Sequence, residues 1–280
     1  MLIRCWGSRG SIPVSGKSYL KYGGDTTCIE LRTKNDDIII IDAGSGIRRL
    51  GNTLIKEGRK DLNIIFTHAH WDHILGFPFF KPLYFEGTSI NMLGSPIAQD
   101  SIKHIISKTM QAPNFPVRFE DMKAEISYIG ACPDWFRIKA ISIEPIRISH
   151  PNQGMGYKFT EDSKSFVFLT DNELTYVHPG GLTYEGYCEF ARGADLLIHD
   201  SEYLPEEYAK HTKTWGHSIY LDSLNLALEA GVKSFGLFHH NQERSDEQID
   251  KMVEDCKSII KERGSKMECF AVAQDMVLEV

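Results

Sequence analysis

The chain has 280 residues, a formal net charge of −7 and 42% hydrophobic residues, an ordinary share for a globular protein that buries a core. The acidic balance and the lack of a dense Lys/Arg run argue against a large nucleic-acid partner, although they leave room for a local basic pocket for a small phosphate. The six cysteines are scattered and indicate neither a disulfide framework nor a cysteine zinc site. Because the sequence shows no secretory leader and no apolar run long enough to span a membrane, we expect one domain over residues 1–280, located in the cytoplasm.

The predicted strands are short and rich in β-branched residues. Several are apolar throughout, as central strands covered on both faces are. The second and third are expected to pair across a polar turn. In chain order the strands are Leu2–Cys5, Thr27–Arg32, Asp37–Ile41, Asn63–Thr67, Ile126–Ile129, Lys139–Ile148, Gly156–Thr160, Ser165–Thr170, Asp195–His199, Ser234–Phe238 and Cys269–Val272.

The predicted helices are fewer and amphipathic, and the third has a serine at its start and Gly231 as its stop. Strands with interspersed helices favour two sheets with helices outside them. The proline- and aromatic-rich stretch 77–119 is interpreted as a loop or lid. The helices are expected at Ile47–Lys56, Ser101–Met110, Ser218–Ala230 and Asp246–Arg263.

The strongest chemical signal is His68-Ala69-His70-Trp71-Asp72-His73, which directly follows the predicted strand Asn63–Thr67. Imidazole and carboxylate groups are natural ligands of zinc and similar cations. In an extended segment His68 and His70 point the same way, and Asp72 and His73 can then turn toward a second point. The pattern therefore suits two adjacent metal ions better than one. The alternative is a polar turn with exposed histidines.

Four positions in one loop cannot saturate two metal ions, so further ligands are needed. His150, Asp171 and His239 each stand at the end of an apolar strand, where rigid strands meet functional loops. Each of them alone would be interpreted as an ordinary loop residue. Together with the histidine cluster they complete a plausible ligand set.

These residues, in this order and with Asp42 before them, make the chain resemble the metallo-β-lactamase superfamily over nearly its full length. The resemblance implies a four-layer αββα sandwich with two metal ions at one edge. It also implies that Asp42 orients ligands by hydrogen bonds; the alternative is a turn aspartate before glycines. The implied ligands are His68, His70 and His150 for the first metal, Asp72, His73 and His239 for the second, and Asp171 as a bridge.

Two questions about the ligand set stay open in the sequence. His240 neighbours His239, so either could be the last ligand. We prefer His239, and the competing interpretation of His240 is a solvent-facing loop histidine. The metal ions are expected to be divalent, with zinc favoured and manganese or iron as alternatives, since all accept His/Asp sets.

The branch of the superfamily is indicated by Asp171, because classical β-lactamases place a cysteine there. In addition, His199-Asp200-Ser201-Glu202 and Trp215-Gly216-His217-Ser218 resemble tRNase Z-type and phosphoribosyl cyclic phosphodiesterase-type enzymes. The resemblance implies that Asp200 orients His217, which would stabilise phosphate oxygens or protonate the leaving group. Alternatively, His217 lies near a helix start capped by Ser218, and His199 is buried and structural.

Two glycine-rich loops, Trp6–Ser11 and Tyr22–Cys28, also resemble small phosphodiesterase-like members of the superfamily, but as weak signals. Backbone N–H groups in such loops can approach an anion, and Arg9 could add positive charge. Ordinary tight turns explain both loops at least as well.

The predicted function is hydrolysis of a small phosphodiester, such as a cyclic nucleotide or ribose phosphate, by a hydroxide shared between two metals. Asp72 would orient that nucleophile while serving as a ligand. A membrane partner is not expected, a nucleic-acid partner is not favoured, and a homodimer is left open. The alternatives are a lactonase or thioesterase on the same scaffold, or a di-iron redox protein.

Overall fold

The computed structural model describes residues 1–94, 96–130 and 134–280. Its strands form two seven-stranded sheets. The first sheet contains, in spatial order, β14 (Val277–Glu279), β1 (Leu2–Gly7), β2 (Cys28–Arg32), β3 (Ile38–Ile41), β4 (Asp61–Ile65), β5 (Ser89–Gly94) and β6 (Glu125–Gly130). The second contains β13 (Glu268–Ala271), β12 (Ser234–Phe238), β11 (Leu196–Asp200), β10 (Lys164–Leu169), β9 (Met155–Glu161), β8 (Ile141–Arg147) and β7 (Phe136–Ile138).

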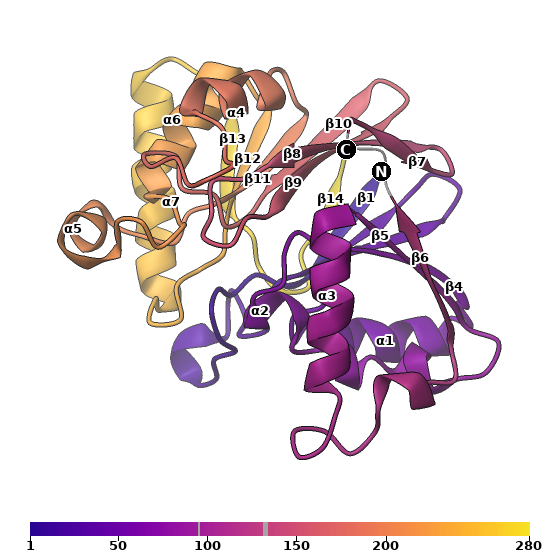
Figure 1. Cartoon of the computed structure of the whole chain (residues 1–280). Coiled ribbons are helices and arrows are strands. Elements are labelled where there is room, and N and C mark those ends of the chain that lie inside the picture. Colours follow the sequence, from indigo (N-terminus) through magenta and orange to yellow (C-terminus); the bar gives the residue numbers. More distant parts are fainter. Residues whose placement is uncertain (95, 131–133) are drawn as a thin grey trace.

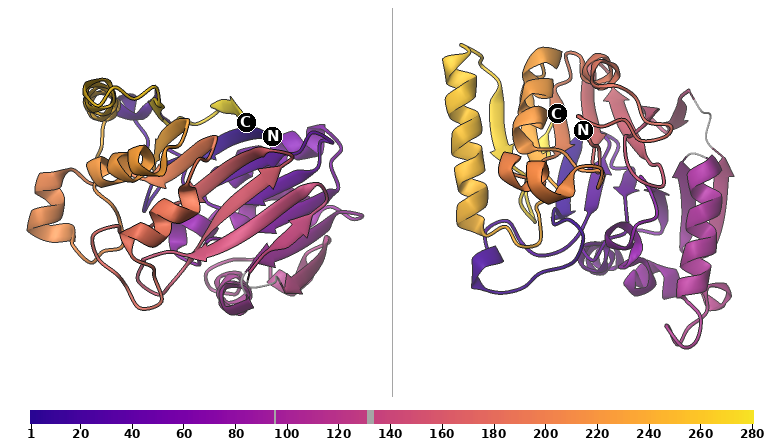
Figure 2. Two further views of the ribbon diagram at one scale, coloured as in Figure 1. Left: turned by 90° about the horizontal axis from the view of Figure 1, so that it is seen from above. Right: turned by 60° about the vertical axis from the view of Figure 1, so that its left-hand side comes forward.

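The sheets stack face to face and helices cover both outer faces (Figures 1 and 2). Helices α1 and α3 lie outside the first sheet, and α4, α6 and α7 lie outside the second. This arrangement confirms the predicted four-layer αββα sandwich. Among the described residues, no helix combines the length and apolar character of a membrane-spanning segment. The helices are α1 (Ile47–Lys56), α2 (Trp71–Ile74), α3 (Pro96–Thr109), α4 (Tyr184–Ala191), α5 (Pro205–Glu207), α6 (Tyr220–Ala230) and α7 (Asp246–Glu262).

Strand β3 shows why the central strands are apolar on both faces. Ile39 and Ile41 pack between the two sheets, whereas Ile38 and Ile40 pack on the outer side against residues such as Leu50 of α1. Because each fully buried aliphatic side chain contributes roughly 1.5–3 kcal/mol, both faces stabilise the sandwich.

The strand directions bring distant loops to one edge of the sandwich. β2 and β3 pair antiparallel, as predicted. β3, β4 and β5 then run parallel to one another, and so do β10, β11, β12 and β13. The carboxyl ends of parallel neighbours lie at the same edge of a sheet, so the residues after β3, β4, β10, β11 and β12 can form one site.

The expectation that residues 77–119 form a loop or lid is wrong. Phe77 and Phe80 are fully buried, and β5 is an interior strand between β4 and β6. Phe77, Pro78, Phe80 and Pro82 build part of the core, because their large apolar surfaces are stabilised by burial. Helix α3 begins before the predicted Ser101, and α4 was not predicted.

Candidate metal centre

Three residues that the sequence singles out adopt an unusual backbone conformation where strands end. Asp42 follows β3, Asp171 follows β10 and His239 follows β12, and their φ angles are 62°, 51° and 57°. Positive φ is uncommon for residues other than glycine and costs about 1–3 kcal/mol where it occurs. Such strain persists when the surrounding structure imposes it, and it is concentrated at functional sites.

The first donor group contains His68, His70, His150 and Asp171, whose ligand atoms all lie within 4.8 Å of one another. His150 Nε2 is 2.9 Å from His70 Nδ1, and His68 Nε2 is 3.5 Å from Asp171 Oδ2. His70 comes from the loop after β4 and His150 from the loop after β8, 80 residues away in sequence. The fold therefore brings together the residues predicted for the first metal.

The second donor group contains Asp72, His73, Asp171 and His239, again with all ligand atoms within 4.8 Å. His239 Nε2 is 3.0 Å from Asp72 Oδ2, and His73 Nε2 is 3.2 Å from Asp171 Oδ1. Asp171 belongs to both groups, as a bridging ligand would.

The chemistry of these groups fits divalent metal ions. Among the described residues, the Nε2 atoms of His68 and His73 are buried without a hydrogen-bond partner, which is costly unless something else satisfies them. Burial alone would raise the pKa of Asp171, but the neighbouring His239 and His73 hold it well below its ordinary value. Burial lowers the pKa of His68, His70 and His150, so the first group offers neutral imidazole nitrogens beside the ionised Asp171. Imidazole and carboxylate are the donors that zinc and similar cations prefer.

Asp42 fixes the orientation of His73. His73 Nδ1 donates to Asp42 Oδ2 at 2.8 Å, which leaves Nε2 directed at the donor group. Asp42 also accepts hydrogen bonds from the backbone N–H and the hydroxyl of Thr67, both at 2.7 Å. A carboxylate of this kind sets the ring orientation of a metal-binding histidine, so Asp42 occupies the supporting position that the resemblance implied.

Two further acceptors orient the other histidines. His150 Nδ1 donates to the carbonyl oxygen of Gly216 at 2.9 Å, and His239 Nδ1 donates to Glu202 Oε2 at 2.9 Å. Glu202 is fully buried and was not predicted to have a role. Its position two residues after Asp200, at the end of a buried strand, was the available signal.

The predicted pair of Asp200 and His217 is formed. His217 Nδ1 donates to Asp200 Oδ2 at 2.7 Å, and its ring stacks on that of His239 with centroids 4.7 Å apart. Burial lowers the pKa of His217, but Glu202 and Asp200 outweigh that effect and raise it to about 9. The two carboxylates therefore favour the protonated form of His217, which lies beside both donor groups.

Ser218 does not cap helix α6, as one alternative had it. The N-cap of α6 is Ile219, and Ser218 Oγ donates to the carbonyl of Asn172 at 2.5 Å. Ser218 Oγ also accepts from the backbone N–H of Leu174 at 3.1 Å. These bonds join the turn that carries His217 to the loop that carries Asp171.

The other two histidines of the region have structural positions. His199 is buried, its Nδ1 donates to the Asp200 carbonyl at 2.7 Å, and burial lowers its pKa to about 4. His240 is buried too and its Nε2 donates to the Val272 carbonyl at 2.9 Å, so its interpretation as a solvent-facing residue is wrong. His239, not His240, lies in the donor group.

The amino-terminal loop contacts the site through its backbone. The N–H of Ser11 donates to Asp72 Oδ2 at 2.9 Å, and a Cβ on Gly10 would lie 2.4 Å from the His239 ring. Arg9, in contrast, is fully buried and donates to backbone carbonyls, including that of Arg244 at 2.8 Å. Arg9 therefore ties loops together, and its interpretation as an anion contact is wrong.

This geometry belongs to a chain that matches a known protein family. Residues 38–240 match the model of the beta-lactamase superfamily domain. The match covers more than two-thirds of the chain and includes every residue of both donor groups. The chain belongs to the beta-lactamase superfamily.

Individual superfamily members resemble the chain over most of its length. Ribonuclease Z of Sulfolobus acidocaldarius is 29% identical over 72% of the chain and 77% of the relative. Ribonuclease Z of Picrophilus torridus is 25% identical over 98% of the chain and 96% of the relative. The solved structure of the metallo-beta-lactamase fold protein YhfI from Bacillus subtilis has a TM-score of 0.72 at 16% identity, covering 100% of this chain and 99% of that one. A diphosphatase from the PhnP family has a TM-score of 0.69 at 18% identity, covering 100% and 97%.

These findings confirm the predicted superfamily, with its resemblance to ribonuclease Z, and the prediction of a metal-dependent hydrolase. Membership of the beta-lactamase superfamily and the clustered His and Asp donors together imply divalent metal ions.

Proposed function

We propose that this protein is a metal-dependent phosphodiesterase whose two donor groups hold two divalent metal ions, zinc foremost. The observation that carries the proposal is the pair of Asp200 and His217, hydrogen-bonded to each other beside the donor groups. A phosphodiester needs its negative charge stabilised and its departing oxygen protonated, and an imidazolium supplies both. The ligands would be His68, His70 and His150 in one site, Asp72, His73 and His239 in the other, and Asp171 between them.

The residues of the site would have different roles in the reaction, according to their charge. Two adjacent metal ions, when bound, would activate water for attack on phosphorus and neutralise charge on the phosphoryl group. Asp72, fixed by the Ser11 N–H, would orient the attacking water. His217 would give its proton to the departing oxygen, and Asp200 would stabilise the imidazolium before transfer.

The experiment that tests this proposal compares leaving groups. Metal-loaded wild-type protein is assayed with a phosphodiester that has an aryl leaving group and with one that has an alkyl leaving group. His217→Ala is expected to lower kcat by about 10²–10⁴-fold for the alkyl ester, and less for the aryl ester, whose leaving group needs no proton. His68→Ala should lose activity on both. Unchanged activity in both variants would sink the proposal.

RNA is the first substrate class to test, because relatives that match 72% and 98% of the chain carry the name ribonuclease Z. The names of those relatives argue against the expectation that nucleic acid is not a favoured partner of this protein. The structure adds Trp71 and Trp215, which are 62% and 60% exposed and stand next in sequence to His70 and Gly216. Exposed aromatic rings beside phosphate-binding groups suit stacking with bases.

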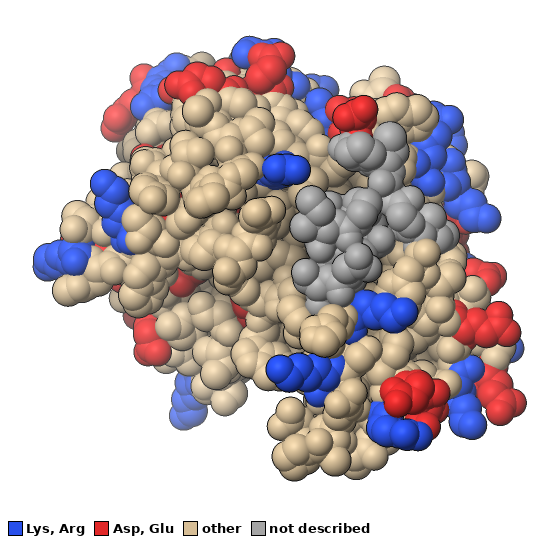
Figure 3. All heavy atoms as spheres, viewed as in Figure 1, with Lys and Arg blue, Asp and Glu red and all other residues tan. Residues whose placement is uncertain are grey.

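A small nucleotide phosphodiester, such as a cyclic nucleotide, is the second candidate. The net charge is −7, whereas proteins that track an RNA backbone rely on cationic surface. Figure 3 shows one face of the molecule, where most basic and acidic side chains of the described residues lie toward the rim. A substrate with one phosphodiester needs few cationic contacts.

One panel separates these candidates from the carbonyl alternatives. It contains a 3′-extended RNA, cyclic mononucleotides, a lactone and a thioester, assayed with the same metal-loaded protein. Endonucleolytic cleavage of the RNA would support the first substrate class, and turnover of cyclic nucleotides alone would support the second. Preference for the lactone or thioester would overturn the phosphodiesterase proposal.

A further inference from the structure

A buried carboxyl group joins three segments beside the metal centre. Glu173 lies two residues after Asp171 and is 1% exposed. It accepts hydrogen bonds from its own loop, from the turn after α5 and from residues 214–216. The donors are His178 Nε2 at 2.7 Å, the Tyr208 hydroxyl, the Thr214 N–H at 2.7 Å and the Gly216 N–H at 2.8 Å.

The turn 214–216, which receives two of these bonds, has a strained backbone. Thr214 has a φ of 73° and Gly216 a φ of 96°. The first is a conformation that a β-branched residue rarely adopts, at a cost of about 1–3 kcal/mol. The two N–H bonds to Glu173 supply interactions that hold the turn in this shape.

The same turn packs directly on a donor-group histidine. A Cβ on Gly216 would lie 2.1 Å from His150 Nδ1, so only glycine permits this approach. The Gly216 carbonyl accepts from His150 Nδ1 while its N–H donates to Glu173. One residue thus connects the buried carboxyl to the ring that must present Nε2 to the metal. His217 follows immediately in the chain.

We propose that Glu173 is a positioning residue for the first donor group. It holds the turn 214–216 so that the Gly216 carbonyl fixes the tautomer and orientation of His150. The second donor group has its own supports, because Asp42 orients His73 and Glu202 orients His239. Loss of the Glu173 carboxyl therefore weakens one of the two metal sites selectively. This inference rests on the proposed metal sites.

The test uses a matched pair of variants around one carboxyl group. Glu173→Gln replaces an acceptor oxygen by an NH₂ group, which then faces donors instead of accepting from them. Tyr208→Phe removes one hydrogen bond to the same carboxyl and leaves both bonds to the turn intact. Zinc binding to metal-free protein is titrated by calorimetry, and folding is checked by circular dichroism.

Glu173→Gln is expected to bind one zinc equivalent about 10–100-fold more weakly, as loss of an orienting partner does, with the other equivalent within about twofold of wild type. Its kcat should fall while KM changes little. Tyr208→Phe should match wild type in both zinc equivalents. Equal weakening of both equivalents in Glu173→Gln, or the same loss in Tyr208→Phe, would show a general structural role and overturn the proposal.

A second variant, Glu173→Asp, tests the proposal in case Glu173→Gln does not fold. Glu173→Asp keeps the carboxyl but shortens it by one methylene, and it should weaken one zinc equivalent by a smaller factor. Wild-type affinity for both equivalents in this variant would overturn the proposal. If wild-type protein takes up no zinc, manganese or iron, the proposed function fails first and this inference falls with it.

Discussion

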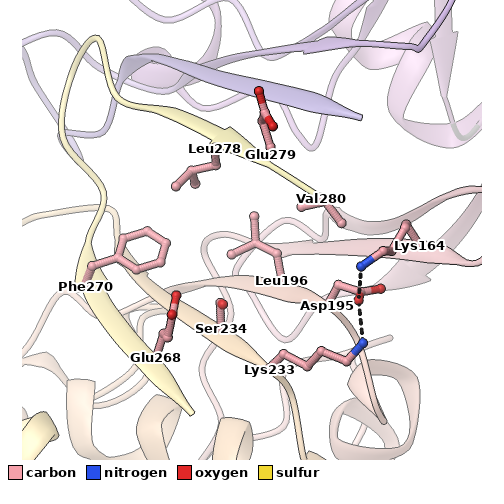
Figure 4. Close-up of a pocket in the computed structure, with 10 residues that line it drawn as sticks. All are labelled: Lys164, Asp195, Leu196, Lys233, Ser234, Glu268, Phe270, Leu278, Glu279 and Val280. Atoms are coloured by element: carbon pink, nitrogen blue, oxygen red, sulfur yellow. Dashed lines mark hydrogen bonds and ion pairs between the residues drawn. The ribbon is translucent and has the colours of Figure 1, made fainter. Parts of the chain in front are cut away.

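The second sheet has charged clusters at both ends of its strands, and the two ends satisfy their polar atoms differently. At the carboxyl ends the histidines and aspartates are buried beside His68 and His73, which follow β4 of the first sheet. Among the described residues, the Nε2 atoms of His68 and His73 and the Nδ1 atom of His240 have no hydrogen-bond partner. At the amino ends, Asp195 accepts from Lys164 at 3.1 Å and from Lys233 at 2.7 Å, and both lysines are more than half exposed. Figure 4 shows these two lysines reaching Asp195 in an open pocket.

The comparison teaches that charge density alone does not identify a functional site. The Asp195 cluster is complete without a ligand, because its carboxylate already has cationic partners. The donor groups around Asp171 leave buried nitrogens whose desolvation is uncompensated, and a metal ion would compensate it. Three variants test this contrast.

The largest effect is expected from Asp171→Ala. Asp171 contributes to both donor groups, so its loss should impair both metal sites. Metal ions supply several kcal/mol of transition-state stabilisation and each ~1.4 kcal/mol is a factor of ten, so kcat/KM should fall by more than about 10³-fold. Metal content by atomic emission and steady-state kinetics check this. A variant that still holds two metal ions tightly would contradict the bridging role.

An intermediate effect is expected from Asp42→Asn. The amide cannot accept from His73 and Thr67 as the carboxylate does, so the orientation of His73 should loosen. We expect about 10–100-fold weaker binding of one metal equivalent, measured by competition with a chromophoric chelator. The affected site should be the second one, opposite to the site weakened in Glu173→Gln. The double variant Asp42→Asn/Glu173→Gln should bind both metal equivalents more weakly. If it binds metal like either single variant, Asp42 and Glu173 do not support separate metal sites.

The smallest effect is expected from Asp195→Asn. Burial raises the pKa of Asp195, but Lys233, the Ser165 N–H and Lys164 outweigh it and lower the pKa to about 2. A carboxyl with a lowered pKa in the folded state stabilises the fold above its unfolded pKa of about 4, and this contribution disappears as the pH falls through 2.

The Asp195 pairs are partly exposed, so the loss at pH 7 should be about 1 kcal/mol or less. Urea denaturation at pH 7 and near pH 2 measures it. The difference between Asp195→Asn and wild type should shrink at the lower pH, while metal content and activity stay at the wild-type level. A loss of metal binding in this variant would break the contrast between the two ends.

Local patterns were sufficient for much of the fold. Helix α1 has the predicted bounds Ile47–Lys56, and strand β12 has the predicted bounds Ser234–Phe238, because their apolar spacing reflects burial directly. The stretch 77–119 was misinterpreted for the converse reason. Proline and aromatic residues are common in loops as well as in cores, and only packing against α1 and the first sheet distinguishes the two.

The sequence by itself determined which residues offer metal-binding chemistry, because the spacing of His68, His70, Asp72 and His73 is a local property of one loop after a strand. Only the tertiary structure determined which residues of the site contact one another. His239 meets Asp72 across 167 residues, and Glu173 reaches Gly216 across 43. Such contacts depend on strand order and loop packing, which no local pattern encodes. For the same reason Glu202 and Glu173, each two residues after a predicted site aspartate, were recognised as supports of the site only from their contacts in the folded chain.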